Sequence, residues 1–139
     1  MDILSLSDLD LRKAVAKAQG YEVKESHVCT FANFSGLNRR AAYRYSLQKD
    51  GKEVAFSLVS EENVLPPLDL AHTFPLVLEM NEMGIVIDLY ALPPDQSEIR
   101  FVVWYNGLGK TGYVYSDSNT DPSDAIAKCY LLVRKEMGM

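Results

Sequence analysis

Histidine and cysteine, on which most catalytic bases, thiol nucleophiles and metal sites depend, are scarce in this chain of 139 residues. The two histidines, His27 and His72, are far apart, and neither has a companion at triad or metal-ligand spacing. The two cysteines, Cys29 and Cys129, form no CxxC motif and no Cys/His cluster. Nucleophile-elbow, HExxH and Ser-x-x-Lys patterns are missing as well. We therefore expect no metal, no cofactor and no enzymatic activity, with a small hydrolase built from scattered carboxylates as an open alternative.

Long apolar runs and an excess of basic charge are also missing. No run approaches the roughly 20 apolar residues that span a bilayer, and the acidic start MDILSLSDLDLRK does not match a signal peptide. Two thiols fit a reducing compartment, so we expect a cytoplasmic protein without a membrane partner. The net charge of -5 argues against a nucleic-acid polymer as partner, although a local basic pocket remains compatible with it.

What is present is an ordinary globular composition, with 47% hydrophobic and 24% charged residues. The length suits one domain, and no repeat or linker interrupts it, so residues 1–139 are predicted to form a single domain. Spacing of apolar residues predicts helices over 8–19, over a segment ending at Gly84, and from Asp121-Pro122 to about Glu136. Strands are predicted over 21–34, 42–59, 85–92, 99–105 and 113–116. This order predicts an α+β fold, an antiparallel sheet covered by helices in an α/β/α layered sandwich.

Local signals sharpen two of these elements. Asp50-Gly51 lies between two alternating segments and predicts a tight hairpin turn. The start of the second helix is ambiguous because Pro75 is tolerated only in a first turn. Either Thr73 caps a short helix, or Asp69 caps a longer one that contains Pro75 and bends there.

The stretch WYNGLGKTGYVY, residues 104–115, contains Gly109-Lys110-Thr111, which is how a phosphate-binding P-loop ends. The P-loop pattern requires its first glycine at position 104, where this chain has tryptophan. It also requires a helix after the motif, whereas the following residues predict a strand. The P-loop interpretation is therefore rejected.

The same stretch still predicts a glycine-rich hairpin connection with binding potential. Asn106, Lys110 and Thr111 could meet an anion, while the flanking rings of Trp104, Tyr105 and Tyr113 stack on a base. The alternative is a plain β-turn without a ligand.

Arginines gather in a second segment of this acidic chain. Arg39, Arg40 and Arg44 lie within six residues, and guanidinium groups match phosphate oxygens in pairs of hydrogen bonds. The alternative is a solvated segment whose arginines offset nearby acids. Whether the loop at residues 35–40 and that at 106–112 converge is the question that decides between these interpretations.

Two segments resemble one known family. The segment PPLDLAHTFPLVLEMNEMG, residues 66–84, is similar to a helix of phage ABA-sandwich domain proteins, and TDPSDAIAKCYLLVRKE, residues 120–136, resembles their closing helix. The opening helix, from Leu9 to Val23, also fits. Pro75 departs from the family's uninterrupted helix, and residues 21–60 have no counterpart in it. The resemblance implies an α/β/α fold and extends to Thoeris-type anti-defence sponges, which sequester cyclic nucleotides as oligomers. It assigns no binding residue in this sequence.

Two functional hypotheses follow. The first is a non-enzymatic, phage-type protein in the host cytoplasm that sequesters a small anionic cyclic nucleotide as a homo-oligomer. In it the phosphates meet Arg39, Arg40, Arg44 and Lys110, and the rings of Trp104 and Tyr105 stack on the base. The second is a protein–protein interaction module that inhibits a host enzyme, and it predicts an exposed apolar or aromatic patch.

Overall fold

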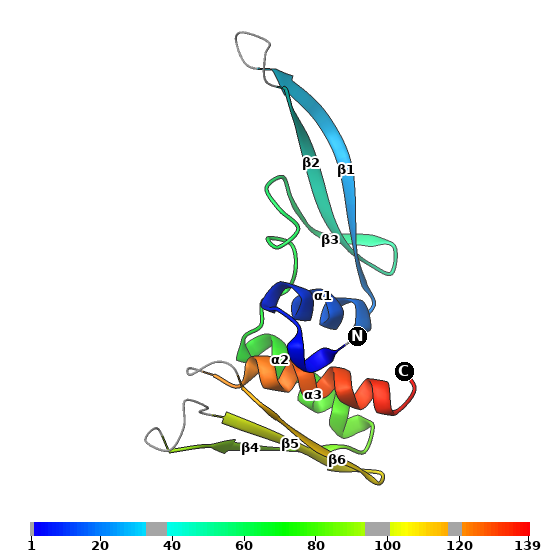
Figure 1. Ribbon diagram of the computed structural model, residues 1–139. Coiled ribbons are helices and arrows are strands. Elements are labelled where there is room, and N and C mark those ends of the chain that lie inside the picture. The colour runs from blue at the N-terminus through cyan, green and yellow to red at the C-terminus, as the bar shows by residue number, and fades with distance from the viewer. Residues whose placement is uncertain (1, 33–38, 94–100, 117–120) are drawn as a thin grey trace. The chain divides into compact units, whose positions relative to one another are not determined.

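Figure 1 shows a computed structural model of the chain, which describes residues 2–32, 39–93, 101–116 and 121–139. For residues 29–32 and 39–42 the description covers the backbone alone. The chain divides into two compact units: unit 1 comprises Met1–Val15 and Pro67–Met139, and unit 2 comprises Ala16–Pro66. We describe each unit by itself, and the single domain over residues 1–139 stays a prediction.

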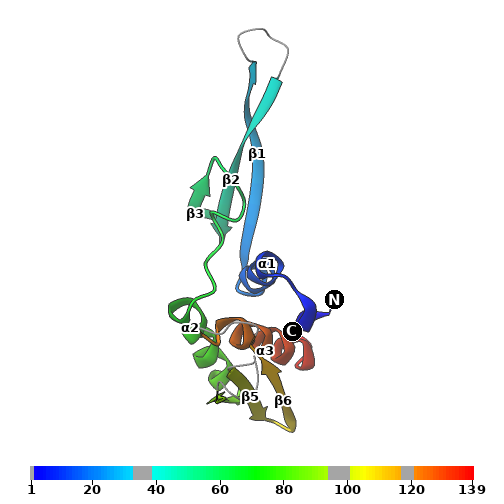
Figure 2. The same cartoon turned by 60° about the vertical axis from the view of Figure 1, so that its left-hand side comes forward.

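Unit 1 is an antiparallel sheet with two helices on one face. Its strands are β4 (Val86–Ala91), β5 (Phe101–Gly107) and β6 (Lys110–Tyr115), in the order β4-β5-β6. Helix α2 (Leu70–Glu82) contacts β4, and helix α3 (Ser123–Glu136) contacts β5, β6 and α2. Both views show α2 and α3 on the same side of this sheet (Figure 1, Figure 2). The short η1 (Ile3–Ser5) packs against α3, and α1 (Asp8–Ala18) begins in unit 1.

The core of unit 1 lies between the helices and the sheet. Strand alternation sends every second side chain toward the helices, so Val103 and Val114 are buried there. Helix α3 contributes Ile126, Cys129, Tyr130 and Val133, and all of these are buried. From α2, Leu76 and Met80 are fully buried. Burial of such side chains contributes roughly 25 cal/mol per Å² of apolar area, which makes this layer the main source of stability in unit 1.

Unit 2 contains a second antiparallel sheet in the order β1-β2-β3, with strands β1 (Tyr21–Ala32), β2 (Arg39–Lys49) and β3 (Lys52–Ser57). Asp50 and Gly51 join β2 to β3 with φ angles of 54° and 76°. Two successive positive φ angles are typical of a type I′ turn, so the predicted Asp-Gly hairpin is confirmed.

The helix starts differ from the predictions by little. Asp69 caps α2 by accepting a hydrogen bond from the His72 backbone N–H at 2.9 Å, so the longer alternative that contains Pro75 is confirmed. Helix α3 begins at Ser123, two residues after the predicted cap. Asp121 still accepts a hydrogen bond from the Ser123 N–H at 2.8 Å.

The predicted α+β class, with an antiparallel sheet covered by helices, is confirmed. The strands form two three-stranded sheets instead of one. Among the helices that the structure describes, none is long and apolar enough to cross a membrane.

An aromatic sheet face as the candidate functional site

The glycine-rich stretch forms a tight hairpin between β5 and β6. Gly107 pairs with Lys110, and the turn residues Leu108 and Gly109 have φ angles of 54° and 75°. Lys110 and Thr111 are the first residues of β6. The prediction that a strand follows the Gly-Lys-Thr motif is therefore confirmed, and no helix N-terminus lies there to bind a phosphate.

Strand alternation separates the predicted ligand contacts of this hairpin. Trp104 pairs with Tyr113, and Asn106 pairs with Thr111 two residues further, so these side chains share one face of the sheet. Tyr105 and Lys110 fall on the opposite face, on the side of the helices. The predicted group is therefore divided between two faces.

Tyr105 is a core residue. It is 4% exposed, and its hydroxyl donates a hydrogen bond to Glu136 Oε1 of α3 at 3.0 Å. Burial, reinforced by Glu136, raises the pKa of Tyr105 to about 12. Its ring cannot stack on a ligand beside Trp104, because the two side chains point to opposite faces of β5.

The face that carries Trp104 is open and aromatic. We call it the aromatic face and define it by the exposed side chains of Tyr90, Trp104, Tyr113 and Tyr115. Tyr113 lies centrally: its ring centroid is 4.9 Å from that of Trp104 and 5.2 Å from that of Tyr115. Tyr90 and Tyr115 lie on either side of Val102, which is 6% exposed. Each ring is between 42% and 52% exposed, so the rings form a surface and not a core.

The aromatic face has polar neighbours but carries no cation. Asp88 of β4 lies directly opposite Trp104, while Asn106 and Thr111 lie at the hairpin end. Val86 is the one described strand position of this face not yet named. None of the described strand positions of this face is a lysine or an arginine. At these described positions a phosphate would meet a carboxylate and no opposite charge.

Sequence reasoning missed Tyr90 and Tyr115. The signal was available in the alternation of Tyr113-Val114-Tyr115, because positions two apart lie on one face of a strand. The sequence could not place Tyr90 on this face, because the register of β4 against β5 depends on long-range pairings such as that of Tyr90 with Val102.

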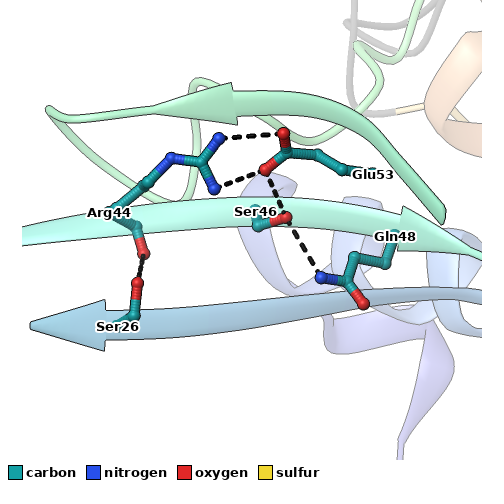
Figure 3. Close-up of polar contacts among 5 residues, drawn as sticks. All are labelled: Ser26, Arg44, Ser46, Gln48 and Glu53. Carbon is teal, nitrogen blue, oxygen red and sulfur yellow. Dashed lines mark hydrogen bonds and ion pairs between the residues drawn. The ribbon is translucent and has the colours of Figure 1, made fainter. Parts of the chain in front are cut away.

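The arginine segment lies in unit 2, where Arg44 has a structural partner (Figure 3). Its Nη2 donates to Glu53 Oε2 at 2.8 Å, and its guanidinium lies 4.5 Å from the ring centre of Phe56. Ser46 donates to the other oxygen of Glu53 at 2.8 Å, and these hydrogen bonds, that of Arg44 foremost, hold the pKa of Glu53 below its usual range. This geometry favours the alternative in which Arg44 offsets a nearby acid.

Arg39 and Arg40 lie in β2, but their side chains fall outside the described residues, as do residues 33–38 of the predicted arginine loop. The arginines belong to unit 2 and the glycine-rich hairpin to unit 1. Convergence of the two segments therefore stays a prediction.

Unit 1 also contains a pocket of about 400 Å³. Asp121, Asp124 and the buried Lys128 line it together with Leu68 and with residues at and just before the start of α1. The carboxylate of Asp124 accepts a hydrogen bond from Ser116, and that of Asp121 holds the start of α3. These acids therefore have structural partners, and no group of three or more metal-ligating side chains occurs in the described ranges.

His72, one of the two histidines, has a structural role as well. Its Nδ1 lies 2.6 Å from Asp69 Oδ1, at the cap of α2. This contact, together with the backbone hydrogen bond, lowers the pKa of Asp69.

Comparisons with protein-family models, with curated proteins and with solved structures found no match. The resemblance to phage ABA-sandwich domain proteins and to anti-defence sponges therefore stays a prediction. The function has to be argued from the geometry of unit 1.

Proposed function

We propose that this chain is a non-enzymatic binding module that engages a partner protein through the aromatic face. The observation that carries the proposal is the row of exposed rings, Trp104, Tyr113 and Tyr115, on a sheet face that no helix of unit 1 covers. Tryptophan and tyrosine bury large areas at a low entropic cost, and they are enriched among the residues that dominate binding energy at interfaces.

The sheet also supplies the rigidity that a binding surface needs. Trp104 and Tyr113 are a cross-strand pair held by the β5–β6 ladder, and the buried side chains of Val103 and Val114 anchor these strands from below. Because the rings are pre-positioned, little conformational entropy is lost when a partner covers them. Asp88, beside Trp104, adds a preference for a donor or a cation on the partner.

The charge distribution supports a protein partner over an anionic one. Asp88 of β4 pairs with Trp104, and its carboxylate would repel a phosphate on the aromatic face. An apolar protein surface flanked by a lysine or arginine suits the same set of side chains. In the predicted setting, the partner is a host enzyme in the cytoplasm and the chain is its inhibitor.

Sequestration of a cyclic nucleotide is the second candidate. One observation favours it: the exposed ring pair of Trp104 and Tyr113 lies beside the amide of Asn106 and the hydroxyl of Thr111. Stacking on a base contributes about 1–3 kcal/mol, but tight binding would require cations from Arg39, Arg40 or Lys110.

Calorimetry with a cyclic ADP-ribose isomer tests this candidate. Binding that disappears on joint replacement of Arg39, Arg40 and Lys110 by alanine would support it over the protein-binding proposal, and recovery of the intact ligand after heat denaturation would exclude hydrolysis.

Photo-crosslinking in cells tests the leading proposal. A photoreactive amino acid at position 113 should capture one protein, whereas the same group at position 56, an exposed aromatic site of unit 2, should not capture it. Equal capture at both positions, or none at position 113, would contradict the proposal.

Affinity measurements with the captured protein then locate the contact. Trp104→Ala should weaken binding about 30-fold, which corresponds to the roughly 2 kcal/mol of a dominant interface residue. Phe56→Ala is the matched control, because Phe56 is also a large exposed aromatic residue but lies in the other sheet. An unchanged affinity of Trp104→Ala would remove the aromatic face from the interface.

A further inference from the structure

Helix α2 carries a row of exposed apolar side chains that unit 1 does not use. Leu70, Phe74 and Leu78 are 53%, 60% and 49% exposed, and their spacing of four residues places them on one side of the helix. We call this row the α2 stripe. Helices normally turn such a row toward a core, so its exposure requires an explanation.

The contacts of α2 show where the stripe points. Glu79 faces α3, because its carboxylate accepts a hydrogen bond from Tyr130 at 2.9 Å and lies 3.5 Å from Arg134. With 3.6 residues per turn, Leu70, Phe74 and Leu78 lie roughly 100° to 180° around the helix from Glu79. Since α2 contacts β4 and α3 contacts β5 and β6, the stripe points away from α3 to the outer side of α2, and away from Leu76 and Met80, which take the buried side of the helix.

The neighbouring edge of the sheet is also apolar and, among the described residues, unprotected. β4 is an edge strand with the sequence VIDLYA, and its pairing with β5 shows no bulge. Asp88 is its one charged residue, and the strand has neither lysine nor proline, the usual protection of an open edge. Leu89 pairs with Val103, which is fully buried, yet Leu89 is 51% exposed. Among the described residues, the helical layer therefore leaves Leu89 of this edge half exposed.

We propose that the α2 stripe and the β4 edge form a docking surface for a second copy of this chain. The two copies are related by a two-fold axis, β4 pairs antiparallel with the partner's β4, and the two α2 stripes pack against each other above this junction. The β4-β5-β6 sheet of one copy then joins that of the other copy into one sheet of six strands.

The chemistry of the edge is self-complementary, which selects a second copy as the occupant. A two-fold interface brings the same patch of both copies together. With the axis at Leu89, Leu89 meets the partner's Leu89, and Asp88 lies opposite the partner's Tyr90. An axis at Asp88 would instead place two carboxylates opposite each other, which is destabilising. The stripe carries no charge, so packing it against itself meets no repulsion.

This dimer leaves Trp104, Tyr113 and Tyr115 of the aromatic face free, whereas Tyr90 lies at the β4 junction. Leu89 and Trp104 lie on opposite faces of the sheet, because Trp104 pairs with Asp88, the neighbour of Leu89. The inference therefore does not depend on the proposed function, and the two can fail separately.

Sedimentation tests the dimer. The wild-type chain should sediment at twice the 15.6 kDa of one chain, and Phe74→Glu should raise the dissociation constant of the dimer by at least about 30-fold. Tyr113→Glu is the matched control, since it places the same charge on the aromatic face and should leave the dimer intact. A wild-type monomer at concentrations of about 100 μM, or a Phe74→Glu dimer of unchanged strength, would overturn the proposal.

A cross-link reports the register without a destabilising charge. In a Cys29→Ser background, Leu89→Cys should form an intermolecular disulfide on oxidation, because directly opposed residues of an antiparallel pair have Cα atoms about 4.5–5.5 Å apart, within the range that a disulfide spans. Tyr90→Cys, opposite the partner's Asp88, should not. Cross-linking of both variants alike, or of neither, would contradict the proposed register, and Trp104→Ala should leave the result unchanged.

Discussion

At the scale of single residues, Trp104 and Tyr105 are neighbours with opposite roles. Trp104 is 42% exposed on the aromatic face, whereas Tyr105 is 4% exposed and hydrogen-bonded to Glu136. The sequence pattern grouped them because both are aromatic and border a glycine-rich turn. Their alternation along β5 was sufficient to place them on opposite faces of the sheet. The position of α3, a helix distant in sequence, decides which of the two residues points to the core.

Buried tyrosines make the stability of the fold sensitive to high pH. Burial raises the pKa of Tyr105 and of Tyr130 from 10.0 to about 12. The unfolded chain then loses these protons at lower pH than the folded chain, so the contribution is fully present below pH 10 and is lost as the pH rises toward about 12. Denaturant midpoints measured across this range should fall. In the double variant Tyr105→Phe/Tyr130→Phe the fall should be shallower, and an identical fall would contradict the assignment.

At the scale of elements, local chemistry predicts most of what unit 1 contains. Asp69 and Asp121 mark the two helix starts, and turn glycines mark the hairpins, because capping and positive φ angles are local requirements. The strand limits that lie clear of the undescribed residues moved by up to three residues, as at the start of β6, since ladder hydrogen bonds and not side-chain types decide where a strand ends. Pro75 made the start of α2 ambiguous, because proline removes one helical hydrogen bond. Packing of the buried Leu76 and Met80 stabilises the longer helix despite this loss.

The β5–β6 hairpin depends on one glycine more than on the others. A Cβ at Gly107 would overlap the backbone carbonyl of Gly84, and the φ angle of Gly107 is 153°. We expect Gly107→Ala to lower the free energy of unfolding by about 2 kcal/mol or more. Gly109→Ala is the matched control: its φ angle is 75°, but no atom lies within 4 Å of its Cβ, so only about 1 kcal/mol should be lost. Equal losses of unfolding free energy in urea denaturation would show that the close approach of the Gly84 carbonyl adds nothing to the cost of a Cβ at position 107.

At the scale of the whole molecule, the sequence could not reveal which segments meet. The arginines and the glycine-rich hairpin belong to different units, so their convergence stays a prediction, and Arg44 is paired with Glu53. Strand order, the open face of the β4-β5-β6 sheet and the bare β4 edge all depend on pairings between distant residues. The aromatic face and the dimer surface therefore required the structure, whereas the α+β class did not.

If both proposals hold, the dimer presents two aromatic faces on one continuous sheet. Binding to an immobilised partner should then gain from two simultaneous contacts, often by about 10²-fold or more when the geometry permits. Phe74→Glu should lose this gain while its affinity for the free partner in solution stays that of the wild type. Affinities of the wild type and of Phe74→Glu, each measured with immobilised and with free partner, provide the comparison. A parallel loss in solution would mean that α2 contacts the partner directly.

The most direct test of the central claim, that the aromatic face is the binding surface, uses Trp104 as the reporter. It is the only tryptophan in the chain, so fluorotryptophan labelling gives one fluorine NMR resonance whatever the partner contains. On saturation with the captured protein, this resonance should shift and lose its sensitivity to solvent composition, because the half-exposed ring becomes buried. A resonance that keeps its position and its solvent sensitivity in the saturated complex would contradict the account.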